Sequence, residues 1–312
     1  MSIKDILKKN LFLKKTYLFY LKKKYEIATM ISPKLNTSMR YRAVFGKKLD
    51  LKNPVDFSDK ILWLKLNTYY NNPLVRQCAD KYKVREYVER AGCAYILNEL
   101  LCVYESVEEI KWDELPDKFA IKLNVGCGYN IIVSDKQKLN IEEAERKLAK
   151  WIKEKYYLAF SEMQYKDVKP YILVEKYLET EIGNAIPDYK VYCFNGVPKA
   201  ILVMHDRNRN IKSEFFDSEW NALDNTDKYA KPDITTQRPE CLEEMMTVSK
   251  KLSAPFPFVR CDFYIVENRL VFGEMTFTPA GGLMVSQTCV DGKSMGELLD
   301  ITSLFQSKKT NM

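Results

Sequence analysis

The pattern of apolar and polar residues divides the chain into a helical first part and a second part rich in short strands. Residues 3–25 carry leucine and isoleucine near the helical period among many lysines, which predicts an amphipathic helix. Further helical stripes follow within 33–116, notably at 58–66 and 75–91, between turns at Asn-Pro pairs and a glycine. From Phe119 onward, short apolar runs separated by tight turns predict strands instead.

The predicted elements of the second part are mostly hairpins, with a few helices between them. In chain order they are a strand at 119–123, a glycine loop, a strand at 129–133, a helix at 141–157, a strand at 171–175, strands at 189–194 and 200–204 joined by an Asn-Gly turn, a polar surface excursion at 206–236, a helix at 242–252, and a hairpin of 258–266 with 270–275. This order indicates a mixed α/β fold built from α+β lobes. The expected regions are a basic helix at 1–30, a mainly helical region at 31–116, a first lobe at 117–178, a second lobe at 179–302 and a C-terminal tail at 303–312.

The positive charge of the chain is concentrated at its N-terminus. The formal net charge is +7, and residues 1–24 hold eight lysines against a single aspartate, so the rest of the chain is neutral overall. A neutral body excludes a basic nucleic-acid-binding protein. The basic segment is expected to contact an anionic membrane surface, or else to dock on the body or on a partner protein with its lysines in solvent.

Cysteine and histidine usage excludes a structural zinc site. The eight cysteines form no CxxC pair and the chain has one histidine, His205. The cysteines are expected to be free, buried thiols in a reducing cytosol. No stretch of 18 apolar residues and no signal peptide are visible, so we expect a cytoplasmic protein.

Two stretches of the first predicted lobe suit a nucleotide. Lys122 lies on a strand just before a loop that contains Gly126 and Gly128, and such a loop can bring backbone N–H groups close to phosphates. The alternative is an ordinary hairpin turn beside a surface lysine. The second stretch, Glu175-Lys176-Tyr177-Leu178, ends an apolar strand and could present backbone groups to adenine, or could simply end in solvent.

The second predicted lobe carries the strongest chemical signal. Asp262 and Glu274 lie on adjacent strands of one predicted hairpin and can share a face, where Mg²⁺ would neutralise their repulsion. Arg260 lies on the same face and can stabilise a transferring phosphoryl group. The alternative is a cluster of salt bridges. On another strand Asp188 and Lys190 share a face, where they could meet ribose and the γ-phosphate or form an exposed ion pair.

The order of these four stretches resembles that of the ATP-grasp superfamily. In detail, residues 36–299 resemble the TupA-like (teichuronopeptide biosynthesis) ATP-grasp family, which is found with bacterial surface-polysaccharide genes. The resemblance also includes Phe57-Ser58-Asp59-Lys60-Ile61, Asp80-Lys81-Tyr82 and Lys122-Leu123-Asn124. It implies an ATP-grasp fold, with two α+β lobes over 117–302 that clasp ATP after a helical N-terminal segment.

The resemblance also implies roles for individual residues. Those expected to act on the nucleotide are Lys122, Gly126, Gly128 and Lys176 on phosphates, the backbone of Glu175, Lys176, Tyr177 and Leu178 on adenine, Asp188 near ribose, Asp262 and Glu274 on Mg²⁺, and Arg260 and Lys190 on the γ-phosphate. The sequence departs from the family pattern at Thr276, where many ATP-grasp ligases carry an asparagine. A threonine weakens the expectation of a second protein-bound Mg²⁺.

The expected activity is that of a carboxylate–amine ligase with an acyl-phosphate intermediate, in bacterial surface or capsular polysaccharide biosynthesis. An ATP-grasp kinase acting on a sugar or polyol hydroxyl is the alternative, because an Asp-x-Lys-x-Tyr strand also occurs in inositol-phosphate kinases of this fold. A non-catalytic nucleotide-binding scaffold and a glycosyltransferase are weaker alternatives, since Asp262 and Glu274 are not a DxD motif. His205 is left open as a base or a structural residue.

Overall fold

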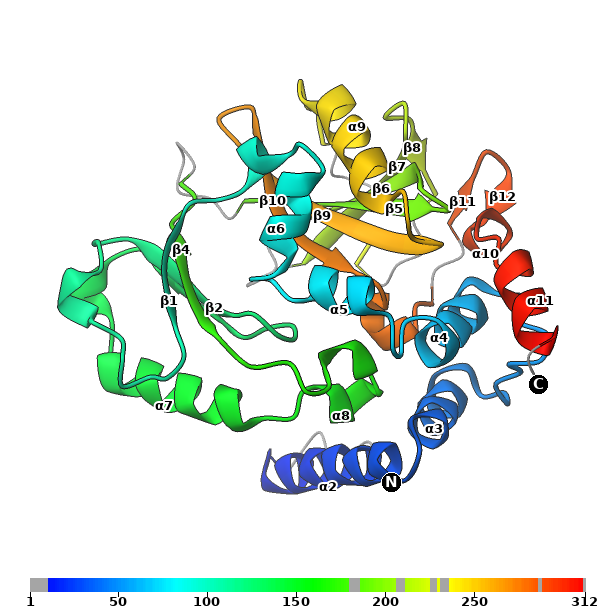
Figure 1. The fold of residues 1–312 in the computed structure, drawn as a ribbon, viewed down its shortest axis with the longest axis horizontal. Coiled ribbons are helices and arrows are strands. Elements are labelled where there is room, and N and C mark those ends of the chain that lie inside the picture. The colour runs from blue at the N-terminus through cyan, green and yellow to red at the C-terminus, as the bar shows by residue number, and fades with distance from the viewer. Residues whose placement is uncertain are drawn as a thin grey trace.

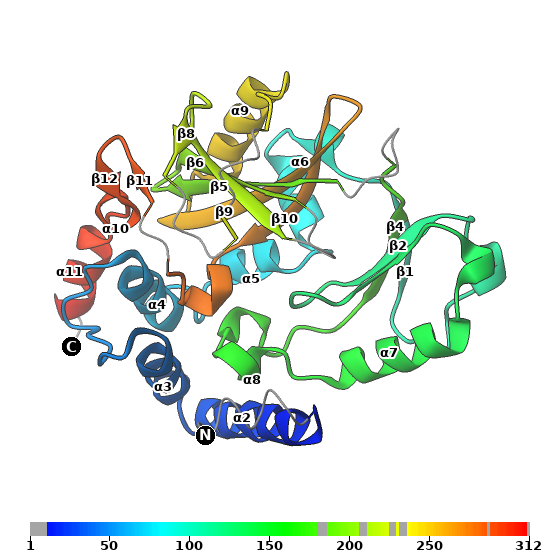
Figure 2. The ribbon, with the colours of Figure 1, turned by 180° about the vertical axis from the view of Figure 1, so that it is seen from behind.

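Two large antiparallel sheets, a small third one and a set of helices make up the described part of the protein. The computed structural model describes residues 11–179, 186–205, 211–224, 229–230, 236–285 and 288–310. The sheets lie in separate halves of the molecule, and helices α2 and α3 run along the bottom of the view in Figure 1; Figure 2 shows the same arrangement from behind. The family expectation of two α+β lobes is therefore confirmed in outline.

The first sheet has four strands in the order β1-β4-β2-β3. The strands are β1 Leu100–Tyr104, β2 Phe119–Leu123, β3 Asn130–Val133 and β4 Ile172–Lys176. Helix α7 (Ile141–Lys153), capped by the side chain of Asn140, covers the sheet with Leu148 in a core shared with Phe119 and Val174. Strand β1 lies before residue 117, so this sheet begins earlier in the chain than the expected lobe boundary. The side chains of β1 are all half-buried, so the strand lacks the alternation of buried and exposed residues by which a strand is predicted.

The second sheet has six strands in the order β10-β9-β5-β6-β7-β8. The strands are β5 Asp188–Phe194, β6 Val197–His205, β7 Lys212–Asp217, β8 Ala222–Leu223, β9 Phe258–Val266 and β10 Arg269–Thr276, and helix α9 is Leu242–Ser253. The hairpins β5–β6 and β9–β10 confirm the predicted pairs. The prediction of a surface excursion at 206–236 is wrong for β7, whose Phe215 and Phe216 are buried in the core beside β6.

The N-terminal helices lie between the two sheets and below them. They are α2 Leu11–Ile31, α3 Pro33–Phe45, α4 Phe57–Asn67, α5 Pro73–Ala79 and α6 Val84–Arg90. The single helix predicted over 75–91 is wrong, because the chain leaves the helix at Asp80. The Asp80 carboxylate accepts hydrogen bonds from the backbone N–H groups of Tyr82 and Lys83 at 2.8 and 3.2 Å, which stabilises the turn. Residues 3–10 of the predicted N-terminal helix lie outside the described residues.

Short elements complete the fold. They are helices α8 Tyr157–Phe160, α10 Met295–Leu298 and α11 Thr302–Thr310, strands β11 Cys289–Val290 and β12 Lys293–Ser294, and 3-10 turns at Ala94–Ile96, Trp112–Glu114, Lys136–Lys138, Met163–Tyr165 and Pro279–Gly282. The expected C-terminal tail is thus largely helix α11, and its Phe305 packs on Trp63 of α4 with ring centroids 5.4 Å apart. Cys78, Cys93, Cys193, Cys241 and Cys261 are free and buried as expected, whereas Cys127 and Cys289 are exposed. Within the described residues, the helices are too short or too polar to cross a bilayer.

Candidate active site

The β9–β10 hairpin places the two predicted metal carboxylates opposite each other. Asp262 pairs in register with Glu274, and Arg260 pairs with Thr276. The register shifts between Phe272 and Glu274, which leaves Gly273 as an extra residue. A Cβ atom at Gly273 would lie 2.9 Å from the carbonyl oxygen of Asp262, so only glycine fits this bulge.

Asp262 is buried and accepts hydrogen bonds from two cations. Lys190 Nζ donates to Oδ2 at 2.7 Å, while Arg260 donates from Nε to Oδ1 at 2.6 Å and from Nη2 to Oδ2 at 2.7 Å. The Asp188 carboxylate lies 3.6 Å from the same Lys190 ammonium. Burial alone would lower the pKa of Arg260, but the charge of Asp262 raises it above its ordinary value. Asp188, Lys190 and Asp262 are buried and form one charged group with the half-buried Arg260, so the alternative of an exposed Asp188–Lys190 pair is wrong.

Glu274 completes this row of charges. Lys81 Nζ lies 3.1 Å from Glu274 Oε2, and the Thr276 hydroxyl donates to Oε1 at 3.3 Å. Burial alone would raise the pKa of Glu274, but the positive charges of Lys81, Lys190 and Arg260 outweigh it and lower the pKa to about 2. Glu274 is thus held as a carboxylate throughout the physiological pH range.

Lys81 joins the two halves of the molecule at this point. Besides Glu274 on the second sheet, its ammonium donates to the carbonyl oxygen of Gly126 at 2.6 Å, in the loop of the first sheet. Its backbone N–H donates to the Asn124 carbonyl at 2.9 Å, and Asn124 in turn donates from its side chain to Asp80. No local pattern in the sequence predicts this role for Lys81. The tripeptide Asp80-Lys81-Tyr82 within the family resemblance was the available signal.

The glycine loop has the backbone that its sequence predicts. Gly126 and Gly128 have φ angles of 81° and 80°, a region that favours glycine. A Cβ atom at Gly126 would lie 2.6 Å from the ring of Tyr156, whereas one at Gly128 would meet nothing within 4 Å. Gly126 is therefore fixed by packing as well as by conformation.

The remaining nucleotide candidates of the first sheet are Lys122 and the segment 175–178. Lys122 Nζ lies 2.7 Å from Glu175 Oε2, so both side chains point to one face of this sheet. Lys176 is exposed and lies 3.3 Å from Glu99, while its backbone N–H donates to the Glu99 carbonyl. Tyr177 is half-buried beside a cavity of about 320 Å³, and Leu178 is half-buried next to it.

A second buried polar cluster follows strand β10 and was not found from the sequence. The Thr278 hydroxyl donates to Glu162 at 2.6 Å, and burial raises the pKa of Glu162. Lys65 donates to the carbonyl oxygens of Phe160 and Gly281 at 2.9 and 3.0 Å, and burial lowers its pKa to about 8. These contacts fix the loop after Glu274. The residues involved lie far apart in the sequence, so no local sequence pattern predicts the cluster.

His205 lies at the end of β6, with Nε2 2.9 Å from the Thr236 hydroxyl and 3.7 Å from Glu214. These contacts do not involve Asp262 or Glu274. The next two residues, Asp206 and Arg207, lie outside the described residues.

Comparisons with known proteins return structural likenesses but no curated relative. No curated protein matches this chain. Among solved structures, the D-alanine–D-alanine ligase from Bacillus anthracis in complex with ATP is similar at 13% identity and a TM-score of 0.42, over 76% of this chain and 67% of that chain. An L-amino acid ligase from Bacillus licheniformis is similar at 12% identity and a TM-score of 0.43, over 71% of this chain and 49% of that chain.

The family is identified by the sequence itself. Residues 59–299, well over half of the chain, match the model of the family described as TupA-like ATPgrasp. The matched range contains every residue predicted to bind the nucleotide or the metal. This chain belongs to the TupA-like ATP-grasp family.

Proposed function

We propose that this protein is an Mg-ATP-dependent carboxylate–amine ligase. The observation that carries the proposal is the row of charges across β5, β9 and β10, in which two carboxylates in register are surrounded by Lys190, Arg260 and Lys81. Lys81 also holds the glycine loop against this row. Such an arrangement suits a triphosphate placed between the two sheets.

The donor set fits one magnesium ion that is shared with a nucleotide. Asp262 and Glu274 are paired across neighbouring strands, and Mg²⁺ is usually bound by one or two carboxylates together with phosphate oxygens. Among the described residues there is no cluster of three or more His, Cys, Asp or Glu side chains that could hold a metal without such help. When bound, Mg²⁺ would neutralise charge on the phosphates.

The chain's own cations would bind and orient the triphosphate. Lys190 and Arg260 now neutralise Asp262, and Lys122 neutralises Glu175. With a nucleotide present, these donors would face phosphate oxygens, with Lys190 and Arg260 nearest the γ-phosphate. Adenine would lie along the backbone of 175–178, and Asp188 would accept from ribose. Positioning and electrostatic stabilisation are the main contributions to phosphoryl transfer.

The reaction has two balanced steps. A substrate carboxylate attacks the γ-phosphorus, the bond to the β-phosphate oxygen breaks, and ADP leaves. An amine then attacks the carbonyl carbon of the acyl phosphate, phosphate leaves with the bonding pair, and the amine loses a proton to give an amide. The family name points to a uronic-acid or amino-acid carboxylate in the cytoplasmic assembly of a surface or capsular polysaccharide.

A kinase that acts on a hydroxyl is the second candidate, because β5 carries the Asp-x-Lys-x-Tyr pattern that also occurs in inositol-phosphate kinases of this fold, and because Thr276 departs from the asparagine of many ATP-grasp ligases. The residue two positions after Glu274 is neutral and short, and its hydroxyl is already hydrogen-bonded to Glu274 and Arg260. A kinase would transfer the γ-phosphate to a substrate hydroxyl and would need no binding site for an amine.

The test is ADP release by the purified protein with a panel of uronates and amino acids, each with and without an amine. A ligase releases ADP in proportion to amide formed, and Glu274→Gln abolishes both. Transfer of labelled γ-phosphate to a stable product without an amine would establish the kinase. ADP release that never depends on an amine contradicts the ligase.

A further inference from the structure

Helix α2 has one face attached to the body and an opposite face in solvent. On the attached face, the Thr29 hydroxyl donates to the Leu158 carbonyl at 2.7 Å and lies 2.9 Å from the Ser161 hydroxyl. Asn36 of α3 donates to the carbonyl of Tyr25 at 2.8 Å. The orientation of α2 on the body is therefore fixed by buried polar contacts.

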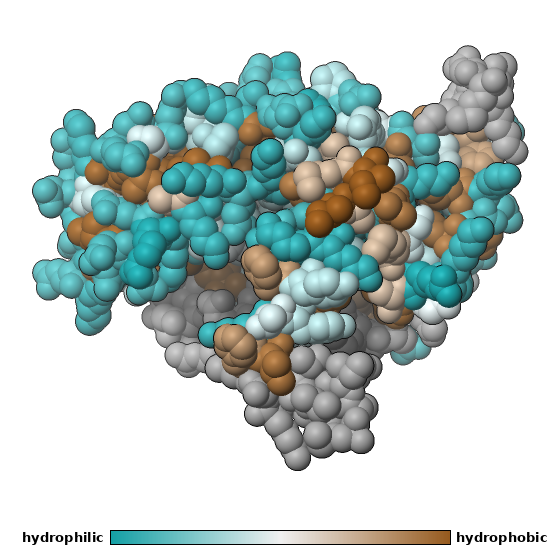
Figure 3. Space-filling model, turned by 90° about the horizontal axis from the view of Figure 1, so that it is seen from below, coloured by the Kyte–Doolittle hydropathy of each residue, from teal (hydrophilic) through white to brown (hydrophobic). Residues whose placement is uncertain are grey.

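The solvent face of α2 is apolar, which is unusual for a surface helix. Six exposed large side chains lie at helical spacing opposite Ala28 and Thr29, and they are Phe12 (75% exposed), Phe19 (62%), Tyr20 (58%), Ile27 (52%), Met30 (64%) and Ile31 (71%). Near its N-terminal end the helix also exposes Tyr17 and Leu18 towards its other sides. A globular surface helix normally turns such residues inward. Figure 3 views the molecule from this side and shows hydrophobic surface open to solvent.

Lys15, Lys22 and Lys24 flank this apolar face, whereas Lys23 lies within it and Lys14 lies on the side of Ala28. Lys14, Lys15, Lys22, Lys23 and Lys24 all belong to α2 and are exposed. The one acidic residue of the helix, Glu26, lies 2.7 Å from Lys23. An apolar face flanked by lysines is complementary to a bilayer surface that carries anionic headgroups, because the apolar groups enter the interface while the ammoniums meet the phosphates.

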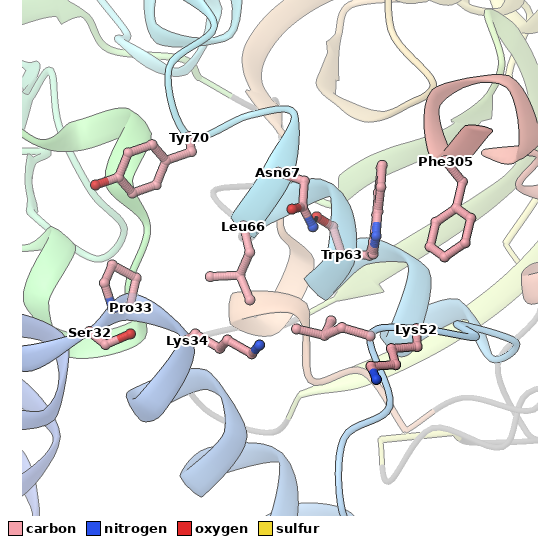
Figure 4. Close-up of a pocket in the computed structure, with 10 residues that line it drawn as sticks. Ser32, Pro33, Lys34, Lys52, Trp63, Leu66, Asn67, Tyr70 and Phe305 are labelled. Carbon is pink, nitrogen blue, oxygen red and sulfur yellow. Dashed lines mark hydrogen bonds between the residues drawn. The ribbon is translucent and has the colours of Figure 1, made fainter. Parts of the chain in front are cut away.

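A cavity lies directly beside the C-terminal end of α2. It has a volume of about 680 Å³, and Ser32, Pro33 and Lys34 of the α2–α3 junction form part of its wall. Figure 4 shows Trp63, Leu66 and Phe305 on one side and Lys34 and Lys52 on another. An apolar wall with two lysines suits a molecule that has a hydrocarbon chain and an anionic head.

We propose that the solvent face of α2 binds an anionic lipid bilayer, and that the neighbouring cavity takes up a hydrocarbon chain of a lipid from that bilayer. Helix α8 links α2 to the candidate active site, since α8 packs on the attached face of α2 and Tyr156, just before α8, packs on Gly126. Docking would thus hold the catalytic lobes close to the membrane. The proposal concerns lipid binding alone and can be tested without any catalytic substrate.

The first experiment is flotation of the full-length protein with vesicles of phosphatidylcholine alone or with phosphatidylglycerol. We expect recovery with the anionic vesicles only. The variant Lys14→Glu/Lys15→Glu/Lys24→Glu should lower the partition coefficient by roughly 100-fold or more, since each lysine near an anionic surface contributes about fivefold.

The matched control reverses three exposed lysines elsewhere, as Lys111→Glu/Lys138→Glu/Lys251→Glu, with the same change in net charge. We expect it to float like the parent protein. A second variant, Phe12→Ser/Phe19→Ser, should also weaken flotation although its charge is unchanged. Failure of the parent protein to float, or equal losses of flotation in the two charge variants, would overturn membrane binding. The exposed face of α2 would then contact a protein partner or remain in solvent.

The second experiment tests the cavity by quenching of tryptophan fluorescence with brominated acyl chains, which act at short range. Trp63 lines the cavity, whereas Trp112, Trp151 and Trp220 lie elsewhere in the fold. We expect quenching in the parent protein and a much smaller fractional quenching in Trp63→Phe at equal vesicle binding. Equal fractional quenching in the two proteins would reject the cavity as a lipid site.

Discussion

The substitution Lys81→Met tests the contact by which the glycine loop is held to the charged row. It removes the ammonium that lies 3.1 Å from Glu274 Oε2 and 2.6 Å from the Gly126 carbonyl, and keeps the length of the side chain. At this separation and an effective dielectric constant of about 20, the attraction is about 5 kcal/mol before desolvation is subtracted. Hydrogen bonds to charged groups have net values of about 1.5–3 kcal/mol.

The pKa of Glu274 gives a second measure of the same interaction. A pKa of about 2, against the ordinary 4.5, corresponds to roughly 3 kcal/mol of favourable interaction shared by three cations. Burial opposes this shift, so the three cations together contribute more than this net value, and Lys81 contributes the most of them. Because the Glu274 side chain is 30% exposed, we reduce the part due to Lys81 to about 2 kcal/mol. The pKa is lower in the folded state, so this stabilisation is present above pH 4.5 and is lost as the pH falls towards 2.

We therefore expect Lys81→Met to lower the free energy of unfolding by about 2 kcal/mol at pH 7. The difference in unfolding free energy between the variant and the parent should become smaller below pH 4.5. Urea unfolding between pH 3 and 8 measures this. Release of the loop should also lower kcat/KM for ATP by at least about tenfold. The control is Lys83→Met, an exposed lysine two residues away, which should change neither quantity appreciably. A Lys81→Met protein as stable and as active as the parent would refute the reasoning.

Further substitutions test the other parts of the site. Gly126→Ala should destabilise the protein by about 2 kcal/mol more than Gly128→Ala in thermal unfolding, because only the former meets the ring of Tyr156; equal effects would contradict this packing. Asp262→Ala should cost about 3 kcal/mol of stability, since it removes the carboxylate that pairs with both Arg260 and Lys190 and leaves Lys190 only the more distant Asp188, and a loss below 1 kcal/mol would argue against this network. Burial lowers the pKa of Lys65 to about 8 in the folded protein, so the free energy of unfolding of the parent should increase from pH 8 to 10.5 as this lysine loses its proton. The difference in unfolding free energy between Lys65→Met and the parent should therefore change across this pH range, and a constant difference would contradict the prediction.

The strands of the site could be predicted because their signals are local. The predicted strands 119–123 and 258–266 are apolar runs bounded by turn residues, and strands β2 and β9 of the structure have these bounds. The chemical content of the β9–β10 hairpin was also readable, since alternation placed Asp262 and Arg260 on one face. Its register depends on the bulge at Gly273, which alternation alone does not specify.

What could not be predicted depends on contacts between distant residues. The apolar stripe over 75–91 continues without interruption in the sequence, but the Asp80 carboxylate captures two backbone N–H groups and breaks the helix there. That break is what places Lys81 between Gly126 and Glu274. Likewise, Glu162 and Thr278 are 116 residues apart, so no periodicity relates them.

Calorimetric titration of the protein with ATP, with and without Mg²⁺, tests the central claim most directly. The account predicts micromolar binding that requires Mg²⁺ and is lost in Glu274→Gln, while Lys83→Met binds like the parent protein. Binding that is indifferent to Mg²⁺ and to Glu274, or no binding at all, would contradict the assignment of Asp262 and Glu274 as the magnesium carboxylates.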